Sequence, residues 1–160
     1  MTETGPRAEL AQRQAAVVAA LIAGAPTPPG FDEAAVRAAA AALLRKRAGE
    51  VAAAWPLLAT AHGPQWNERF AGWAAARPTQ GAFRDGWDLA RALATARPAA
   101  PANAATAAGW AVAAAELAER EARWRYDGQH APRRRRLPCL WRGPGVVAVQ
   151  VLGRVWVWRD

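Results

Sequence analysis

The sequence contains few residues that could hold a metal ion. It has one cysteine, Cys139, and two histidines, His62 and His130. A single cysteine cannot form a disulfide within the chain, and the spacing of these three residues matches no zinc-binding pattern. We therefore expect neither a metal ion nor a cofactor in this chain, and we interpret Cys139 as a small apolar residue of a strand.

Long apolar segments are also missing. The longest run, Ala15–Ala23, is far shorter than the roughly 20 residues that a membrane-spanning helix requires. The first residues are polar and do not place an apolar stretch after a basic one, as a signal peptide does. We expect a cytoplasmic protein that does not associate with membranes.

The sequence carries no motif typical of an enzyme. It has no glycine-rich phosphate-binding loop, and its carboxylates form no recognisable catalytic pair. Glu116, Glu119 and Glu121 alternate with arginines, which predicts a solvated helix face held by ion pairs. Asp85 and Asp88 lie near the predicted start of a helix, where the helix dipole favours negative charge. The chain is therefore not expected to catalyse a reaction by itself.

Lysine is almost absent, and the excess positive charge is concentrated in the last fifth of the chain. The sequence has 21 basic and 13 acidic residues, a net charge of +8, and Lys46 is the only lysine. Residues 130–160 contain seven arginines and one acidic residue, Asp160. Four of these arginines form the run Arg133–Arg136.

This basic run has three interpretations. It can be a solvated linker, a docking patch for an acidic protein or peptide, or a segment that contacts nucleic-acid phosphates. The run is contiguous rather than spread over one helix face, and no base-reading motif accompanies it. We favour the linker or the protein-docking interpretation and keep nucleic-acid binding as the alternative.

The composition of the first four fifths of the chain favours helices. The sequence has 45 alanines, and alanine is the strongest helix former. Apolar residues recur at helical spacing between proline and glycine stops, and Asp32 and Pro56 are typical of helix starts. These patterns predict helices over residues 8–23, 33–55, 57–62, 64–76, 83–96 and 104–126. Their aromatic residues form stripes that we interpret as core.

Beyond Gly128 the pattern changes to that of short strands joined by tight turns. The predicted strands are Leu137–Arg142, Val146–Val151 and Arg154–Trp158. The turn signals between them are Gly143-Pro144-Gly145 and Leu152-Gly153.

A two-residue turn at Leu152-Gly153 would place Val149 opposite Trp156 and Val147 opposite Trp158. Since side chains alternate along a strand, these four residues share one face. The other face then carries Ala148, Gln150, Val155 and Val157. Both faces are largely apolar, so the ribbon must be covered on both sides or pair with something else.

Together these patterns predict a mainly α fold with a small amount of β structure. We expect a helical bundle of five or six helices and a C-terminal antiparallel sheet of two or three strands. The change in pattern divides the chain into a helical domain, residues 1–128, and a basic linker with a small β-sheet, residues 129–160.

The order of the helical motifs resembles the HvfC/BufC-type helical domain. An opening helix with a Leu-x-x-x-Gln pattern, Leu10–Gln14, precedes a Pro/Gly loop, Thr27–Phe31. A long helix ends at an aromatic–proline step, Trp55-Pro56, and a later helix starts with an aspartate and an aromatic residue in Asp85–Leu89. The helix that includes Ala113–Trp124 is similar to the family segment that ends in Leu-Glu-Trp.

This resemblance, which covers residues 8–128, implies a function in the biosynthesis of ribosomally made, modified peptides. Proteins of this kind act as partner subunits or fused domains of multinuclear non-heme iron-dependent oxidative enzymes, which modify precursor peptides, often at cysteine. The partner binds the enzyme and helps to present the leader of the precursor peptide. The implied role of this chain is a non-catalytic subunit of a heterodimer, with the iron held by the enzyme.

The C-terminal strands supply the candidate surface for binding the enzyme and the leader. Interfaces are enriched in aromatic and arginine anchors, and these strands contain both. The final strand pairs on one side only, so an extended peptide can add to its other edge. The side chains of Trp156 and Trp158 either contact such a peptide or pack on the helical part. The candidate partner- and peptide-binding residues are Arg133, Arg134, Arg135, Arg136, Trp141, Arg154, Val155, Trp156, Val157 and Trp158.

Overall fold

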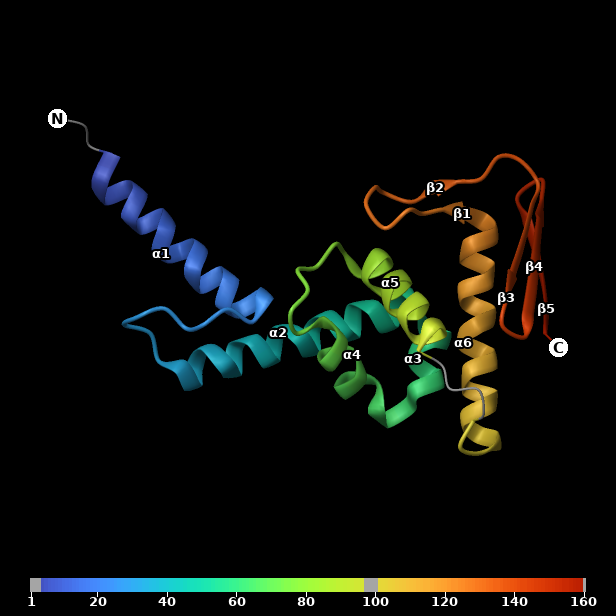
Figure 1. The fold of residues 1–160 in the computed structure, drawn as a ribbon, viewed down its shortest axis with the longest axis horizontal. Coiled ribbons are helices and arrows are strands. Elements are labelled where there is room, and N and C mark those ends of the chain that lie inside the picture. The colour runs from blue at the N-terminus through green and yellow to red at the C-terminus, as the bar shows by residue number, and fades with distance from the viewer. Residues whose placement is uncertain (1–3, 97–100, 160) are drawn as a thin grey trace. The chain divides into compact units, whose positions relative to one another are not determined.

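A computed structural model describes residues 4–96 and 101–159 of the chain (Figure 1). Within these residues the chain is mainly helical and ends in a three-stranded antiparallel sheet, which confirms the predicted fold class. The helices are α1 (Thr4–Ala23), α2 (Glu33–Ala54), α3 (Pro56–His62), the short 3₁₀ helix η1 (Gly63–Gln65), α4 (Trp66–Ala74), α5 (Ala82–Thr95) and α6 (Ala104–Arg123). The strands are β1 (Trp124–Arg125), β2 (Arg133–Arg134), β3 (Cys139–Gly143), β4 (Val146–Val151) and β5 (Arg154–Arg159).

The chain forms two compact units, and α2 contributes to both. The first unit contains residues up to Gly49 together with 67–79, and the second contains 50–66 and the residues from Gln80 onward. The candidate binding residues all belong to the second unit. The division at residue 128, which was based on composition, stays a prediction.

Local capping explains where several helices begin and end. Gly24 follows α1 with φ of +67°, a left-handed conformation that suits glycine and stops a helix. The Asp32 carboxylate accepts a hydrogen bond from the N–H of Ala34 at 2.8 Å before α2. Pro56 occupies the first turn of α3, where its missing N–H has no cost. These three sequence-based predictions are confirmed.

The first unit has a small core formed by α2 and α4. Ala48, Phe70 and Ala74 are buried, and the guanidinium of Arg47 lies 5.7 Å from the centre of the Phe70 ring. The same guanidinium donates a hydrogen bond of 3.0 Å to the carbonyl of Arg77. Phe70 therefore belongs to a core, as the aromatic stripe predicted.

The predicted helix over residues 104–126 is too long. α6 ends at Arg123, and the next two residues form β1, which pairs with β2 in a separate two-stranded sheet. Arg135 explains this end: its backbone N–H donates to the carbonyl of Arg123, and its Nε donates to the carbonyls of Glu121 and Trp124, each at 3.0 Å. A side chain more than ten residues away thus satisfies carbonyls that would otherwise lack partners. The helix predicted over 64–76 is also shorter, because its start is the 3₁₀ turn η1.

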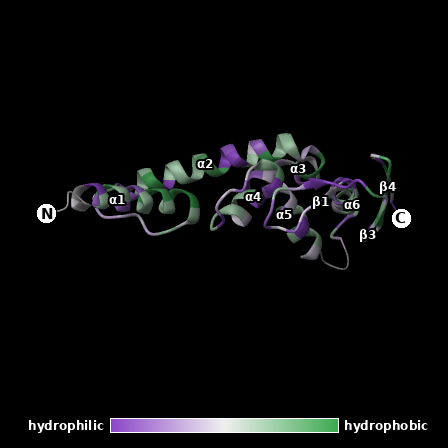
Figure 2. Ribbon diagram, turned by 90° about the horizontal axis from the view of Figure 1, so that it is seen from above, coloured by the Kyte–Doolittle hydropathy of each residue, from purple (hydrophilic) through white to green (hydrophobic). Residues whose placement is uncertain are grey.

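The sheet has the strand order β3-β4-β5, and the predicted register is confirmed. Val149 lies opposite Trp156 and Val147 lies opposite Trp158 across β4 and β5. One face of the sheet packs on α6. Figure 2 shows that β4, the central strand of this sheet, is hydrophobic. That contact is a cluster built from Ala118 and Ala122 of α6, Val146 and Ala148 of β4, and the partly buried Ala114, Trp141, Val155 and Val157.

On its other side α6 meets an aromatic core that includes α5 and the end of α2. Trp55 and Trp87 are fully buried, with ring centres 5.9 Å apart. Trp87 also lies 5.1 Å from the Tyr126 ring, and Trp55 lies 5.9 Å from Phe83. The indole Nε1 of Trp55 donates to the carbonyl of Phe83 at 2.9 Å, so the polar atom of this tryptophan is paired.

The predicted ion-paired face on α6 includes the pair of Glu116 with Arg120 at 3.2 Å, but the prediction that this face is solvated is wrong for two of its three glutamates. Glu116 is 5% exposed and Glu121 is 7% exposed. Glu116 accepts a hydrogen bond of 2.7 Å from the backbone N–H of Leu58, at the start of α3. Glu119, which pairs with Arg123 at 2.9 Å, is the one that remains at the surface. The charge pattern predicted the pair of Glu116 with Arg120, but it could not predict the distant groups that Glu116 and Glu121 bind and that bury them.

Burial of Glu116 has a measurable pH consequence. Desolvation raises its pKa above the ordinary value, although the N–H of Leu58 and the charge of Arg120 act in the opposite direction. A carboxyl group whose pKa is raised by folding adds stability below its unfolded pKa and loses it as pH rises through the folded value. We expect wild type to gain stability relative to Glu116→Gln as pH falls from about 7 to about 4. Urea unfolding of both proteins at several pH values measures this difference, and a difference that stays constant with pH would contradict it.

Two further observations concern the described residues alone. None of their helices is both long and apolar enough to cross a bilayer. No three or more of their His, Cys, Asp and Glu side chains are grouped so that they could hold a metal ion.

Candidate docking surface on the C-terminal sheet

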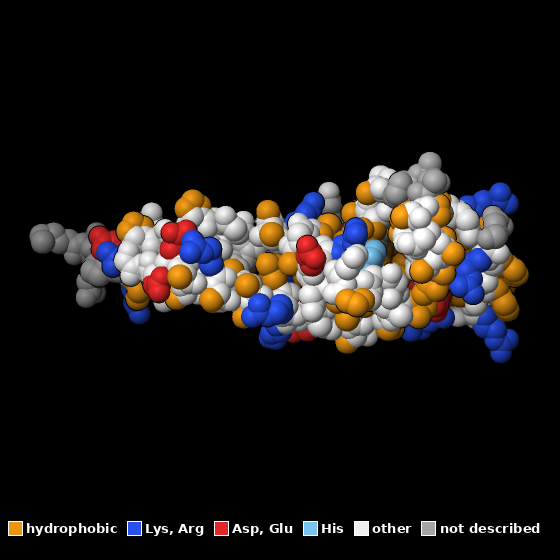
Figure 3. All heavy atoms as spheres, turned by 90° about the horizontal axis from the view of Figure 1, so that it is seen from below, with side chains coloured by type: hydrophobic (Ala, Val, Ile, Leu, Met, Phe, Trp, Pro, Cys, Tyr) orange, Lys and Arg blue, Asp and Glu red, His pale blue; other side chains and the backbone are white. Residues whose placement is uncertain are grey.

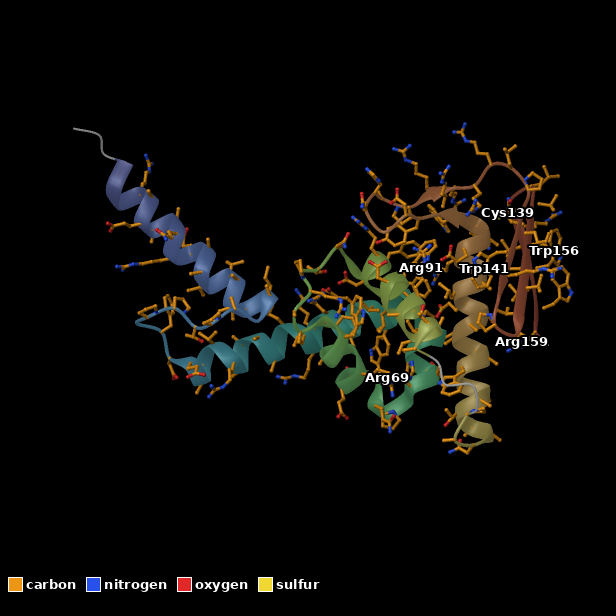
Figure 4. The ribbon with its side chains drawn as sticks, in the orientation of Figure 1. Arg69, Arg91, Cys139, Trp141, Trp156 and Arg159 are labelled. Carbon is orange, nitrogen blue, oxygen red and sulfur yellow. The ribbon has the colours of Figure 1, made fainter. Side chains whose placement is uncertain are left out.

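The two faces of the C-terminal sheet have different environments. The inner face packs on α6, as described above. The opposite face, which we call the outer sheet face, remains accessible in the described chain: Trp156 is 46% exposed and Trp158 is 54% exposed. In Figure 4 the label of Trp156 lies on the side of the sheet away from α6, whereas that of Trp141 lies toward α6. The outer sheet face consists of Leu140, Arg142, Val147, Val149, Val151, Arg154, Trp156 and Trp158.

The observed faces resolve the alternatives that the sequence left open for the strands. The indoles of Trp156 and Trp158 do not pack on the helical part. Trp141, Val155 and Val157, which were also candidate binding residues, lie on the inner face and contact the α6 cluster. Their side chains therefore support the sheet, and only their backbone groups are available for binding.

The outer sheet face is organised in rows across the strands. Leu140 lies opposite Val149, which lies opposite Trp156. In the next row Arg142 and Trp158 lie on either side of Val147. Directly opposed residues on one face of a sheet are in contact, so each row is a nearly continuous strip. Aliphatic side chains fill the centre, tryptophans cover β5, and an arginine lies on β3.

The hairpin between β4 and β5 ends in an exposed leucine with an unusual backbone. Leu152 has φ of +50° and Gly153 has φ of +81°, the pattern of a type I′ turn. Leu152 is 91% exposed and is the only non-glycine residue of the described chain with positive φ. Asparagine, aspartate or glycine suits that position far better than leucine.

Gln150 holds this hairpin in place from the inner face. Its side chain is fully buried, and we assign its amide the orientation that satisfies both polar atoms: Nε2 donates to the carbonyl of Leu137 and Oε1 accepts from the N–H of Gly153, each at 2.8 Å. One side chain thereby ties the turn to the segment before β3. Sequence alternation placed Gln150 on this face but did not reveal its partners.

The outer edge of β5 has backbone groups that are not used by β4. In an antiparallel pair the hydrogen-bonded and non-hydrogen-bonded positions alternate, and the two residues that flank a two-residue turn are bonded to each other. Counting from Val151 and Arg154, the N–H groups of Trp156 and Trp158 point to β4. Those of Val155 and Val157 therefore point to the open edge. Among the described residues no other strand pairs with this edge.

The basic run Arg133–Arg136 is not part of the outer sheet face. Arg133 and Arg134 form β2, and the guanidinium of Arg134 lies 5.1 Å from the centre of the Trp124 ring. The side chain of Arg135 donates to the Glu121 carbonyl at the end of α6, and Arg136 is exposed. The side chains of Arg134 and Arg135 thus contact Trp124 and the end of α6 and support the fold, whereas Arg133 and Arg136 are exposed.

A polar network that the sequence did not reveal joins α5, α6 and the segment after α6. Arg91 Nε donates to Glu121 Oε1 at 2.6 Å, and the same oxygen accepts from the indole of Trp87 at 2.8 Å. Arg91 also donates to the carbonyl of Tyr126 at 3.0 Å, and the Tyr126 hydroxyl donates to Asp88 at 3.0 Å. Burial raises the pKa of Asp88 above its ordinary value. Because its groups are bonded to one another, this network is a brace between elements rather than a reactive site (Arg91 is labelled in Figure 4).

Fold and surface together define a mainly helical protein with a small C-terminal sheet whose outer face is accessible in the described residues. The family model described as SCO6045-like, C-terminal domain, matches residues 11–95, which is more than half of the chain. The chain belongs to this family. The matched residues extend from α1 to α5, so α6 and the sheet lie beyond them.

Comparison with individual proteins adds one relative. A UPF0276 protein of Streptomyces avermitilis is 39% identical over 88 residues, which are 54% of this chain and 18% of the relative. Most of that protein therefore has no counterpart here. No solved structure matches the chain.

Proposed function

We propose that this chain is a non-catalytic partner subunit that binds a peptide-modifying, multinuclear non-heme iron-dependent oxidative enzyme and helps to recognise the leader of its precursor peptide. The observation that carries the proposal is the C-terminal sheet, which combines an accessible tryptophan- and arginine-containing face with an open strand edge. The sheet offers two separate binding elements, one made of side chains and one made of backbone groups.

Two other observations support the proposal. The order of the helical motifs resembles HvfC/BufC-type domains, which occur as partners of such enzymes or fused to them. The relative from Streptomyces avermitilis contains the matched region as 18% of its length, so a related domain occurs there inside a much larger chain. A domain that serves a larger protein is expected to occur in that form as well as alone.

Co-purification tests this function. The tagged chain is expressed together with a multinuclear non-heme iron-dependent oxidative enzyme of the same genome and with the precursor peptide of that enzyme. We expect a stable complex of chain and enzyme whose iron belongs to the enzyme, and faster peptide modification when the chain is present. An enzyme that neither binds the chain nor changes its rate would contradict the proposal. Salt-sensitive binding of the chain to DNA would instead support the nucleic-acid alternative.

The leader is expected to add to β5 as a further antiparallel strand. Main-chain hydrogen bonds would give such a complex its affinity, and the N–H of Val157 lies near the middle of the open edge. Val157→Pro removes this N–H but is compatible with the outer side of an edge strand. We expect leader binding to weaken at least tenfold, or by about 1.4 kcal/mol.

The matched control is Val157→Ala. Since the Val157 side chain packs against the α6 cluster, both substitutions remove inner-face contacts, but only proline removes the N–H. Fluorescence anisotropy with a labelled leader peptide measures affinity, and thermal unfolding shows that both variants are folded. Equal leader affinity for the proline and alanine variants would exclude strand addition at this edge.

A further inference from the structure

We propose that the outer sheet face, with Leu152 at its end, is the docking surface for a segment of the partner enzyme that presents apolar side chains flanked by carboxylates. This inference rests on the proposed function for the identity of the partner. It assigns the enzyme to the outer sheet face and leaves the β5 edge to the leader. The chemistry of the surface specifies the segment.

The apolar part of the surface fits the centre of a protein interface. Trp156 and Trp158 are half exposed, and aliphatic side chains of β4 lie beside them in the rows across the sheet. Tryptophan and arginine are the residue types that contribute most to binding energy at the centre of interfaces. A continuous face with aliphatic residues at its centre is better suited to apolar protein side chains than to nucleic-acid bases, which stack on spaced aromatic rings.

The charged part of the surface selects for carboxylates. Arg142 and Arg154 are exposed on the outer sheet face, and Arg159 is exposed at the end of β5. The sequence has no acidic residue between Gly128 and Arg159. A second copy of this chain would bring arginines against arginines, whereas a segment with Asp or Glu beside its apolar residues would complement them. Figure 3 shows Lys/Arg and hydrophobic side chains together at the end of the molecule where the C-terminal strands lie.

Leu152 provides an independent indication that this surface makes a contact. Its side chain is almost fully exposed, so packing within the chain does not explain it, and its left-handed backbone disfavours leucine. Residues kept in an unfavourable backbone conformation are concentrated at functional sites. Val151 and Arg154, which flank the hairpin tip, both belong to the outer sheet face, so Leu152 is an exposed apolar residue next to that face in the chain.

Leu152→Asn gives the test that separates a docking role from a structural one. Asparagine suits a type I′ turn, so this substitution should raise the melting temperature. If Leu152 contacts the enzyme, the same substitution should also weaken binding severalfold. A variant that is more stable but binds less tightly is not expected of a residue with a purely structural role.

Binding of the full chain to the enzyme recovered in the co-purification experiment, measured by calorimetry, tests the whole surface. We expect the double variant Trp156→Ser/Trp158→Ser to bind at least tenfold more weakly, with circular dichroism and thermal unfolding used to establish that it is folded. The control is Leu57→Ser, which removes an exposed apolar side chain from α3 and should leave affinity unchanged. Wild-type affinity in the double variant and in Leu152→Asn would overturn the surface assignment while the proposed function stands.

A second experiment tests the outer sheet face even if wild type does not bind the enzyme. That lack of binding would contradict the proposed function and would leave the surface assignment to this second experiment. Random peptides displayed on phage are selected on wild type and on the double tryptophan variant. Enrichment of peptides that combine acidic and apolar residues, lost in the double variant, supports the surface. No such enrichment, a self-association abolished by the tryptophan substitutions, or tight binding of oligo(dT) that depends on the same tryptophans would each overturn it.

Discussion

Replacing Glu121 by leucine is expected to lower the free energy of unfolding by about 2–3 kcal/mol, because a buried indole N–H and a partly exposed guanidinium lose their acceptor. Glu121 Oε1 accepts hydrogen bonds from both Trp87 Nε1 and Arg91 Nε. Leucine fills a similar volume but accepts neither bond, so the buried indole N–H and the guanidinium lose their acceptor. The effect therefore comes from unpaired polar groups and not from a cavity.

Two matched variants isolate this cause. Glu121→Gln keeps an oxygen that can accept from Trp87, and we expect it to lose about half as much stability or less. Glu119→Leu removes the acidic partner of the exposed ion pair with Arg123. Exposed ion pairs contribute at most about 1 kcal/mol to stability. Urea unfolding followed by circular dichroism gives all three values. Similar losses for Glu121→Leu and Glu119→Leu would show that the network does not stabilise the fold.

Gly86→Ala is expected to destabilise the protein by about 3 kcal/mol, at the upper end of the range for overpacked cores. A Cβ on Gly86 would lie 2.2 Å from Cδ1 and 2.5 Å from Nε1 of Trp55. The indole cannot easily move aside, because its Nε1 is bonded to Phe83 and the guanidinium of Arg120 lies 4.5 Å from its ring centre. To make room for the Cβ, α5 would have to move away from Trp55 at the end of α2. Because both α5 and the end of α2 support α6, this movement would also disturb the packing of α6.

Gly72→Ala is the control for this second prediction. Gly72 is also within a helix, α4, but it is exposed and a Cβ there would meet no heavy atom within 4 Å. Alanine at this position should stabilise the protein by up to about 1 kcal/mol, because it favours the helix more than glycine does. In the same urea experiment, Gly86→Ala should therefore lower the free energy of unfolding and Gly72→Ala should raise it. A loss of stability at both positions would mean that helix flexibility, and not the contact with Trp55, explains the effect of Gly86→Ala.

Features that depend on near neighbours in the sequence were predictable. Asp32 caps α2 through a residue two positions away, Pro56 begins α3, and Gly24 ends α1. The register of β4 and β5 followed from a two-residue turn and the alternation of side chains, and the structure has that register. In each of these cases the determining interaction lies within a few residues, so the local sequence contains all of it.

Features that depend on distant partners were not predictable, and they include the parts that define the candidate site. Glu116 is buried because it binds the N–H of Leu58, 58 residues away, and α6 ends where it does because Arg135 returns to its last carbonyls. Both faces of the β4–β5 ribbon are apolar, so composition could not say which face is covered.

The sequence by itself therefore determined the mainly helical class, the end of α1, the cap of α2, the start of α3, the three strands of the C-terminal sheet and the register of β4 and β5. Only the tertiary structure decided that the inner face of the sheet packs on Ala118 and Ala122 while Trp156 and Trp158 remain accessible. The physical reason is that hydrogen bonds within helices and tight turns join residues a few positions apart. Burial depends instead on which surfaces meet, and those surfaces come from residues far apart in the chain.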